Sequence, residues 1–225
     1  MNQRIAKLGY IFSLPILGIG YGVLNQNDGL VFSVITDIDR LIPFVKYFII
    51  PYLLWVPFLG GMLVYFFYKD YLLYKKQLIM INVGVLLCYL IYLVFPTTVP
   101  RPLLPETDFF SNLVKLLYSW DNPYNALPSI HVLTSYSILV GCLELSKRLP
   151  RSRMIGIFMT LGILMSIVII LSTLFLKQHT ILDGIASIAI VNILNHVLTV
   201  TEGKELILWP KKRFLLSMMK SKLPS

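Results

Sequence analysis

The stretch LFLKQHTILDG, residues 174–184, joins two strongly apolar runs and decides how the chain must fold. A membrane-spanning helix needs about 20 largely apolar residues. The runs on either side, Met154–Leu176 and Ile181–Val200, both approach that length. Ionisable groups are costly inside a bilayer, so Lys177, His179 and Asp183 should lie at its surface or face the protein interior. The stretch therefore predicts a turn between two membrane helices, with a polar pair where the second helix begins.

The composition of the whole chain agrees with a membrane protein. Its 225 residues are 56% hydrophobic and 14% charged, with a mean hydropathy of +0.74. A soluble domain is about 45–50% apolar by a similar count. We therefore expect a single all-α integral membrane domain over residues 1–225, a bundle of six transmembrane helices with no separate linker. The expected helices are Leu8–Leu24, Tyr47–Tyr68, Leu78–Phe95, Ile130–Leu145, Met154–Leu176 and Ile181–Val200.

Two of these runs have local features of their own. The first lacks a small-x-small cleavage site before the polar stretch at residues 25–29, so we interpret it as a retained anchor and not a cleaved signal. The second contains Pro51, Pro57, Gly60 and Gly61, which membrane helices tolerate because neighbouring groups satisfy the freed backbone. A kink is predicted there.

The basic residues predict the orientation. With the N-terminus inside, fifteen of the twenty Lys and Arg residues fall in inner segments. The positive-inside rule then places both termini in the cytoplasm, including a basic tail at 203–225 that we expect at the membrane interface. Anionic inner-leaflet lipid accounts for the net charge of +9, so no nucleic-acid partner is expected. Cys88 and Cys142 fall inside expected helices and are interpreted as packing residues.

The longest outer segment, residues 96–129, has three parts. It opens with PTTVPRPLLP (96–105), whose prolines favour extended backbone. NLVKLLYSW (112–120) predicts a short helix at the membrane interface. DNPYNALPSIH (121–131) then leads into the fourth membrane helix.

The topology brings distant polar residues together. The fourth and sixth helices both begin at the outer face, and helix N-termini favour anions such as phosphate. Arg101, Ser129 and Lys177 are therefore candidate phosphate-binding residues beside His131, His179 and Asp183.

His179 and Asp183 are four residues apart, which places them on one face of a helix. A carboxylate there can orient the imidazole and leave its other nitrogen free to attack phosphorus. His131 would be a second histidine that protonates the leaving oxygen. This arrangement predicts phosphoryl transfer through a phosphohistidine, with His179, His131 and Asp183 catalytic and with no metal or other cofactor.

Two segments resemble signatures of the type 2 phosphatidic acid phosphatase superfamily, membrane enzymes that dephosphorylate lipid phosphates. PSIH (128–131) is similar to Pro-Ser-Gly-His, and STLFLKQHTILD (172–183) is similar to Ser-Arg, five residues, His, three residues, Asp. VPRP (99–102) resembles the end of the first signature, which closes on Arg-Pro. The resemblance implies that His179 is the nucleophile, Asp183 its partner and His131 the general acid. It implies a catalytic core at about 95–186, a lipid phosphate substrate, and a multi-pass protein of the cell membrane with its active site on the extracytoplasmic side.

The chain also departs from the family pattern. Val94 stands at the lysine position of the first signature, Thr173 at the arginine position of the third, and Ile130 at the glycine position of the second. We infer that Lys177 replaces one of the missing cations. These departures resemble the branch of inositol phosphorylceramide synthase and sphingomyelin synthase, which transfers phosphoryl headgroups between lipids, so a lipid phosphotransferase is the alternative.

Other interpretations remain open at this level. The His179–Asp183 pair can be a structural hydrogen bond, and two histidines with one carboxylate can bind a transition metal. Arg101 can anchor to headgroups, and Ser129 can simply cap a helix. A transporter or structural membrane protein that binds an anion without turnover is the non-enzymatic alternative. His196, near the inner end of the last helix, is interpreted as a packing or interfacial residue.

Overall fold

The structure is a computed structural model that describes residues 7–26, 29–149 and 152–220, with side chains as far as Thr201. Within these ranges the regular elements are helices, and only isolated β-bridges pair Phe32 with Thr97 and Thr98 with Tyr124. The elements are η1 (Lys7–Phe12), α2 (Ser13–Leu24), α3 (Asp37–Leu41), η2 (Lys46–Phe48), α4 (Ile49–Leu53), α5 (Trp55–Lys69), α6 (Tyr71–Val94), α7 (Phe109–Trp120), α8 (Ile130–Arg148), α9 (Arg153–Phe175) and α10 (Ile181–Lys220).

The expected all-α membrane architecture is confirmed, although not the count of six spans. Five segments in the described ranges are long and apolar enough to cross a membrane: Lys7–Leu24, Lys46–Lys69, Tyr71–Val94, Arg153–Phe175 and Ile181–Thr201. Helix α8 is not among them. It carries several Ser and Thr residues and packs among α5, α6, α9 and α10, so its polar side chains are held within protein. A sixth span through α8 stays a prediction.

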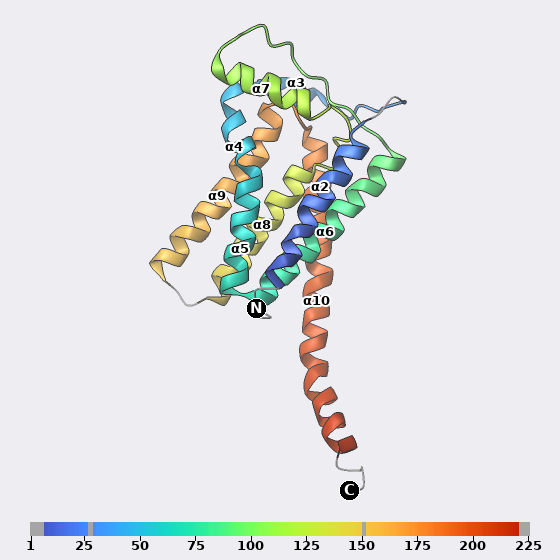
Figure 1. The fold of residues 1–225 in the computed structure, drawn as a ribbon, viewed down its shortest axis with the longest axis vertical. Coiled ribbons are helices and arrows are strands. Elements are labelled where there is room, and N and C mark those ends of the chain that lie inside the picture. The colour runs from blue at the N-terminus through green and yellow to red at the C-terminus, as the bar shows by residue number, and fades with distance from the viewer. Residues whose placement is uncertain (1–6, 27–28, 150–151, 221–225) are drawn as a thin grey trace.

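The long helices run between two opposite ends of the bundle (Figure 1). The start of α2 and the far end of α10 lie at one end of the bundle, and α3 and α7 lie across the other. Basic residues used for the orientation, such as Arg4 and Arg151, lie outside the described residues, as do the side chains of the 203–225 tail. The cytoplasmic position of both termini therefore stays a prediction.

The second expected helix is interrupted where its prolines predict a kink. Helix α4 ends at Leu53, and α5 begins at Trp55. Pro57 has no N–H to donate to the carbonyl of Leu53, four residues earlier, so the regular ladder cannot run through this point.

Two helix boundaries differ from the sequence prediction. Helix α6 begins at Tyr71 and not at 78, because the Asp70 carboxylate caps it by accepting the Leu73 N–H at 3.0 Å. Helix α10 continues to Lys220 and does not end at Val200. The added segment contains Glu, Lys, Leu and Met, which favour helix, so the predicted tail begins as a continuation of the last span.

Helix α8 is the core of the bundle. Its buried side chains include Leu133, Ile138, Cys142 and Leu145. Close approach of α5 requires glycine at position 141, since a Cβ there would lie 2.7 Å from Cε2 of Phe66. This packing fixes the start of α8, where His131 lies.

Candidate active site

The two histidines selected from the sequence meet in the structure. His131 lies in the first turn of α8, and His179 lies two residues before the start of α10. Nδ1 of His131 lies 3.3 Å from Nε2 of His179, and both residues are buried. Because both helices begin beneath α7 at the same end of the bundle, residues 48 positions apart come into direct contact.

The contact made by Nδ1 of His179 determines which ring nitrogen carries the proton. Nδ1 of His179 lies 3.0 Å from the carbonyl oxygen of Ala126. A carbonyl oxygen only accepts hydrogen bonds, so Nδ1 carries the proton and donates it. Nε2 of a neutral His179 then carries an unprotonated lone pair, directed at Nδ1 of His131 at 3.3 Å. This is the arrangement that a nucleophilic imidazole needs.

Aromatic rings hold His131 in place. Its ring centroid lies 4.7 Å from that of Tyr52 and 4.1 Å from that of Trp55. The indole N–H of Trp55 donates to Oγ1 of Thr134 at 2.7 Å, which ties the start of α5 to α8. The break between α4 and α5 thus supplies two walls around the His131 imidazole.

Asp183 is buried beside His179 and caps α10. Its Oδ2 accepts the backbone N–H of Thr180 at 2.6 Å, and its own N–H points to Oγ1 of Thr180 at 3.4 Å. The same Oδ2 lies 3.6 Å from Nδ1 of His179, beyond hydrogen-bond distance. The expected direct hydrogen bond is thus replaced by the Ala126 contact, and Asp183 acts on His179 as a nearby buried charge. Oδ1 of Asp183 has no hydrogen-bond partner.

Ser129 is the N-cap of α8. Its Oγ accepts the Val132 N–H at 3.2 Å, and its carbonyl oxygen accepts the Ser187 hydroxyl at 2.8 Å. These bonds link the starts of α8 and α10 and so help to hold the two histidines together. The side chain is occupied by capping, and its phosphate-binding role stays a prediction.

Arg101 is tied to the residue before His179. Its guanidinium donates to the Tyr118 carbonyl at 3.1 Å and to Oε1 of Gln178 at 2.6 Å, and it lies 4.4 Å over the Tyr118 ring. Its Nε is buried and has no hydrogen-bond partner. Arg101 therefore places a positive charge beside the His179 turn, with one donor still unused.

The side chain of Lys177 is directed toward α3 and away from the pair of His131 and His179. Its ammonium donates to the carbonyl of Asp39 at 2.8 Å and to that of Ile42. Its φ of 52° places it in the left-handed region, which bends the chain between α9 and α10. Burial lowers the pKa of the ammonium, and the charge of Asp39 acts in the opposite direction. Replacement of a missing phosphate-binding cation by Lys177 stays a prediction.

Two of the three positions that depart from the family pattern are those where the family has a cation, and they have distinct environments. Val94 is 84% exposed at the end of α6. Thr173 is buried, and its carbonyl accepts the N–H groups of Gln178 and His179 at 2.9 and 3.2 Å. Thr173 thus shapes the turn that carries His179. His196 is exposed on α10, well along the helix from this turn.

A pocket of about 780 Å³ leads to the two histidines. His131, His179, Tyr52, Trp55 and Thr134 are among its lining residues, together with apolar side chains of α2, α5 and α6. Where the chain is described, no group of three or more His, Cys, Asp or Glu side chains is arranged to hold a metal ion. The site combines an imidazole pair with a largely apolar approach.

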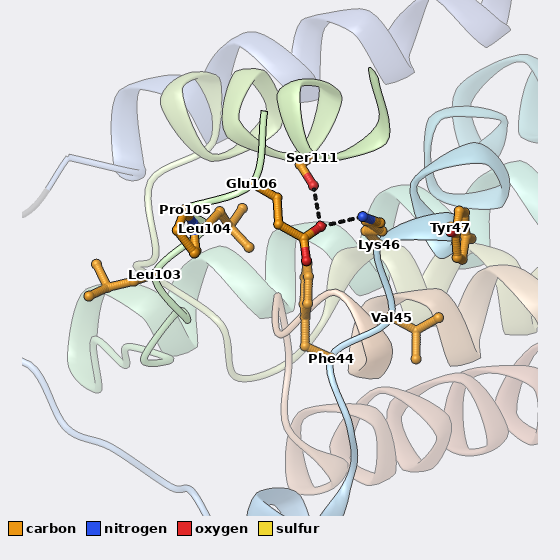
Figure 2. Close-up of a pocket in the computed structure, with 9 residues that line it drawn as sticks. All are labelled: Phe44, Val45, Lys46, Tyr47, Leu103, Leu104, Pro105, Glu106 and Ser111. Atoms are coloured by element: carbon orange, nitrogen blue, oxygen red, sulfur yellow. Dashed lines mark hydrogen bonds and ion pairs between the residues drawn. The ribbon is translucent and has the colours of Figure 1, made fainter. Parts of the chain in front are cut away.

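A second, smaller pocket of about 270 Å³ lies at the outer surface between η2 and the segment before α7 (Figure 2). Its only lining cation is Lys46, whose ammonium contacts Glu106 and lies 2.8 Å from Asp108. Ser111 donates to both carboxylates. With its charge already paired twice, Lys46 fastens α7 to η2 and offers little to an anion.

Sequence reasoning missed several site residues. Tyr52 and Trp55 fall in an apolar run, where aromatic residues are expected in any case, and Ala126 contributes only a backbone carbonyl. The kink predicted from Pro51, Pro57, Gly60 and Gly61 was the one signal of an irregularity near the start of α5.

Comparison with known families agrees with this geometry. The profile described as the PAP2 superfamily matches residues 41–196, which include both histidines, Arg101 and Asp183. No curated protein and no solved structure gives a significant match. The chain is therefore a membrane protein that belongs to the PAP2 superfamily, the type 2 phosphatidic acid phosphatases and their relatives.

Proposed function

We propose that this protein is a metal-independent phosphatase that hydrolyses a lipid phosphate or diphosphate on the extracytoplasmic side of the cell membrane. The observation that carries the proposal is the imidazole pair, with the unprotonated Nε2 of His179 3.3 Å from Nδ1 of His131. Membership of the PAP2 superfamily supports phosphatase-type chemistry.

In the first step the lone pair of Nε2 of His179 attacks phosphorus, and a P–N bond forms as the bond from phosphorus to the lipid oxygen breaks. For this step His131 must carry a proton on both nitrogens; it gives its Nδ1 proton to the leaving oxygen, which departs as an alcohol, or as a lipid phosphate when the substrate is a diphosphate. The imidazoles touch in the structure, so the phosphoryl group must separate them on binding.

In the second step His131, now neutral, takes a proton from water, whose oxygen attacks phosphorus. The P–N bond breaks, inorganic phosphate leaves, and both histidines return to their starting states. Positive charge develops on the His179 ring while it holds the phosphoryl group. Buried Asp183, 3.6 Å away, stabilises that charge, and Arg101 is suited to the phosphoryl oxygens.

Two features support the extracytoplasmic side. The histidines lie at the end of the bundle that also carries α7, opposite the start of α2 and the far end of α10. Lys and Arg are concentrated in segments assigned to the other side.

The test is phosphate release by purified protein from a panel of lipid phosphates and diphosphates, with chelator present. Wild type should release phosphate, and His179→Ala should release none above background. Gly61→Leu is a suitable control, since a Cβ at Gly61 meets nothing within 4 Å. Full activity of His179→Ala would rule out the mechanism.

A lipid phosphotransferase is the second candidate, favoured by the apolar pocket that reaches the histidines. A lipid alcohol would then attack the phosphohistidine in place of water. Labelled donor lipid with a panel of lipid alcohols separates the two: a new phosphorylated lipid formed at the expense of free phosphate indicates transfer. Lipid binding without turnover or phosphohistidine would indicate a non-enzymatic anion-binding protein.

A further inference from the structure

The pocket that reaches the histidines is built partly from a helix outside the family match. Helix α2 spans Ser13–Leu24, whereas the matched residues are 41–196. The lining includes Leu14, Leu17, Gly18 and Tyr21 of α2, opposite residues of α5. Helix α2 packs along α6, and the preceding η1 packs on α5, so the pocket is a groove between α2 and α5.

The groove changes in character along its length. At one end are His131, His179 and the hydroxyl of Tyr52; Tyr52 is only 4% exposed, and its hydroxyl oxygen is buried without a hydrogen-bond partner. The walls beyond are apolar, including Leu59 and Val85. A ligand that satisfies both ends must carry a polar group on an apolar chain.

The groove opens toward the lipid-facing side of the bundle. Phe12 and Val56 line it and are also 69% and 61% exposed, so they lie at its margin. At the outer end the groove is bounded by hydrogen bonds from α2 to the loop after α7: the Tyr21 hydroxyl and the Asn25 amide donate to Asp121 at 2.9 and 2.8 Å. A lipid can therefore approach the histidines sideways, between α2 and α5.

Two glycines leave space along the walls of the groove. Gly18 on α2 and Gly60 on α5 both line it, and a Cβ at either position would meet nothing within 4 Å. Gly60 lies five residues beyond Trp55, roughly 7.5 Å further along the helix from the His131 contact. A Cβ at either position therefore displaces no protein atoms, and because both residues line the groove we expect a larger side chain there to narrow it.

We infer that the groove between α2 and α5 binds the long apolar chain of the substrate, and that α2 thereby selects lipid phosphates with long chains over short ones. This inference rests on the proposed function, because it identifies the chain of the same substrate. It adds that a helix outside the family match forms half of the chain-binding site.

The test compares hexadecyl phosphate with butyl phosphate, whose four-carbon chain ends before the depth of Gly60. Gly18→Leu and Gly60→Leu should each lower kcat/KM for hexadecyl phosphate at least about tenfold, equivalent to about 1.4 kcal/mol, because the added side chain overpacks the occupied groove. Their kcat/KM for butyl phosphate should stay within about threefold of wild type, a difference of less than about 1 kcal/mol.

Matched controls lie beside both positions. Gly61→Leu adds the same side chain to the next residue of α5, and Ile19→Phe enlarges a side chain of α2 that is 72% exposed. Neither residue lines the groove. Both controls should leave the preference for the long chain unchanged. Equal losses in groove and control variants, or equal losses for both substrates, would overturn the inference.

Photocrosslinking tests the groove without turnover. Hexadecyl phosphate with a diazirine near the chain end should label peptides that contain Gly18 and Gly60, in wild type and in His179→Ala. If wild type hydrolyses neither substrate, the proposed function fails, and labelling at these peptides still supports the groove. Turnover with labelling confined to other helices would overturn the groove and leave the proposed function intact.

Discussion

Replacing Asp183 by asparagine removes a buried charge while keeping an oxygen that can cap α10. The Asp183 carboxylate is fully buried, and its Oδ2 lies 3.6 Å from Nδ1 of His179. At an effective dielectric constant of about 20, a unit positive charge at that distance is stabilised by about 4–5 kcal/mol. The His179 ring gains such a charge when it attacks phosphorus. We therefore expect Asp183→Asn to lower kcat by about three orders of magnitude.

The assay is the initial rate of phosphate release at saturating lipid phosphate, with thermal unfolding measured on the same samples. Thr180→Ala is the matched control, because it removes the other half of the cap without changing charge. It should cost about 1 kcal/mol of stability and leave kcat within a few-fold of wild type. A kcat of Asp183→Asn within tenfold of wild type, with the fold intact, would show that the carboxylate serves only as a cap.

Three other substitutions test the packing and the charges. Glu144→Ala leaves the buried Lys76 ammonium without its carboxylate at 2.6 Å, and we expect a loss of about 3–5 kcal/mol in denaturant unfolding; a loss below about 1 kcal/mol would contradict this. Gly141→Val places a methyl-bearing Cβ against the Phe66 ring and should destabilise the fold by about 1–3 kcal/mol in the same assay, so an unchanged midpoint would refute the packing. Arg101→Lys loses the two-pronged guanidinium, and we expect kcat/KM for lipid phosphate to fall about 10- to 100-fold; an unchanged value would exclude Arg101 from phosphate binding.

The helices and the meeting of the histidines were predictable because each depends on a strong local signal. Long apolar runs predict membrane helices, and Pro57 predicts the break before α5. His131 and His179 each stand at the start of a helix, and both helices run in the same direction. Their contact at 3.3 Å follows from that topology together with the packing of α8 against α10.

The orientation of His179 was not predictable, because its partner is a backbone carbonyl. The i,i+4 spacing favours a bond to Asp183, but the carboxylate is engaged by the Thr180 N–H at 2.6 Å. The imidazole donates to Ala126, 53 residues away. A carbonyl belongs to every residue, so the sequence contains no signal for this contact.

The partners of two lysines were not predictable from the sequence. Lys76 belongs to an expected inner loop, yet it is buried in α6 because Glu144, 68 residues later, pairs with it. Lys177 follows α9 in a left-handed turn that directs its ammonium to α3. The groove depends on the position of α2, where Tyr21 donates a hydrogen bond to Asp121, 100 residues later. Each of these depends on tertiary pairing that local patterns do not encode.

The central claim is that His179 carries the phosphoryl group during turnover. The most direct measurement is acid quench of the purified protein during reaction with a lipid phosphate labelled on phosphorus, followed by peptide mapping under alkaline conditions that preserve phosphohistidine. We predict label on the peptide that contains His179 and its absence in His179→Ala. Steady phosphate release without label on His179, or label that persists in His179→Ala, would contradict the account.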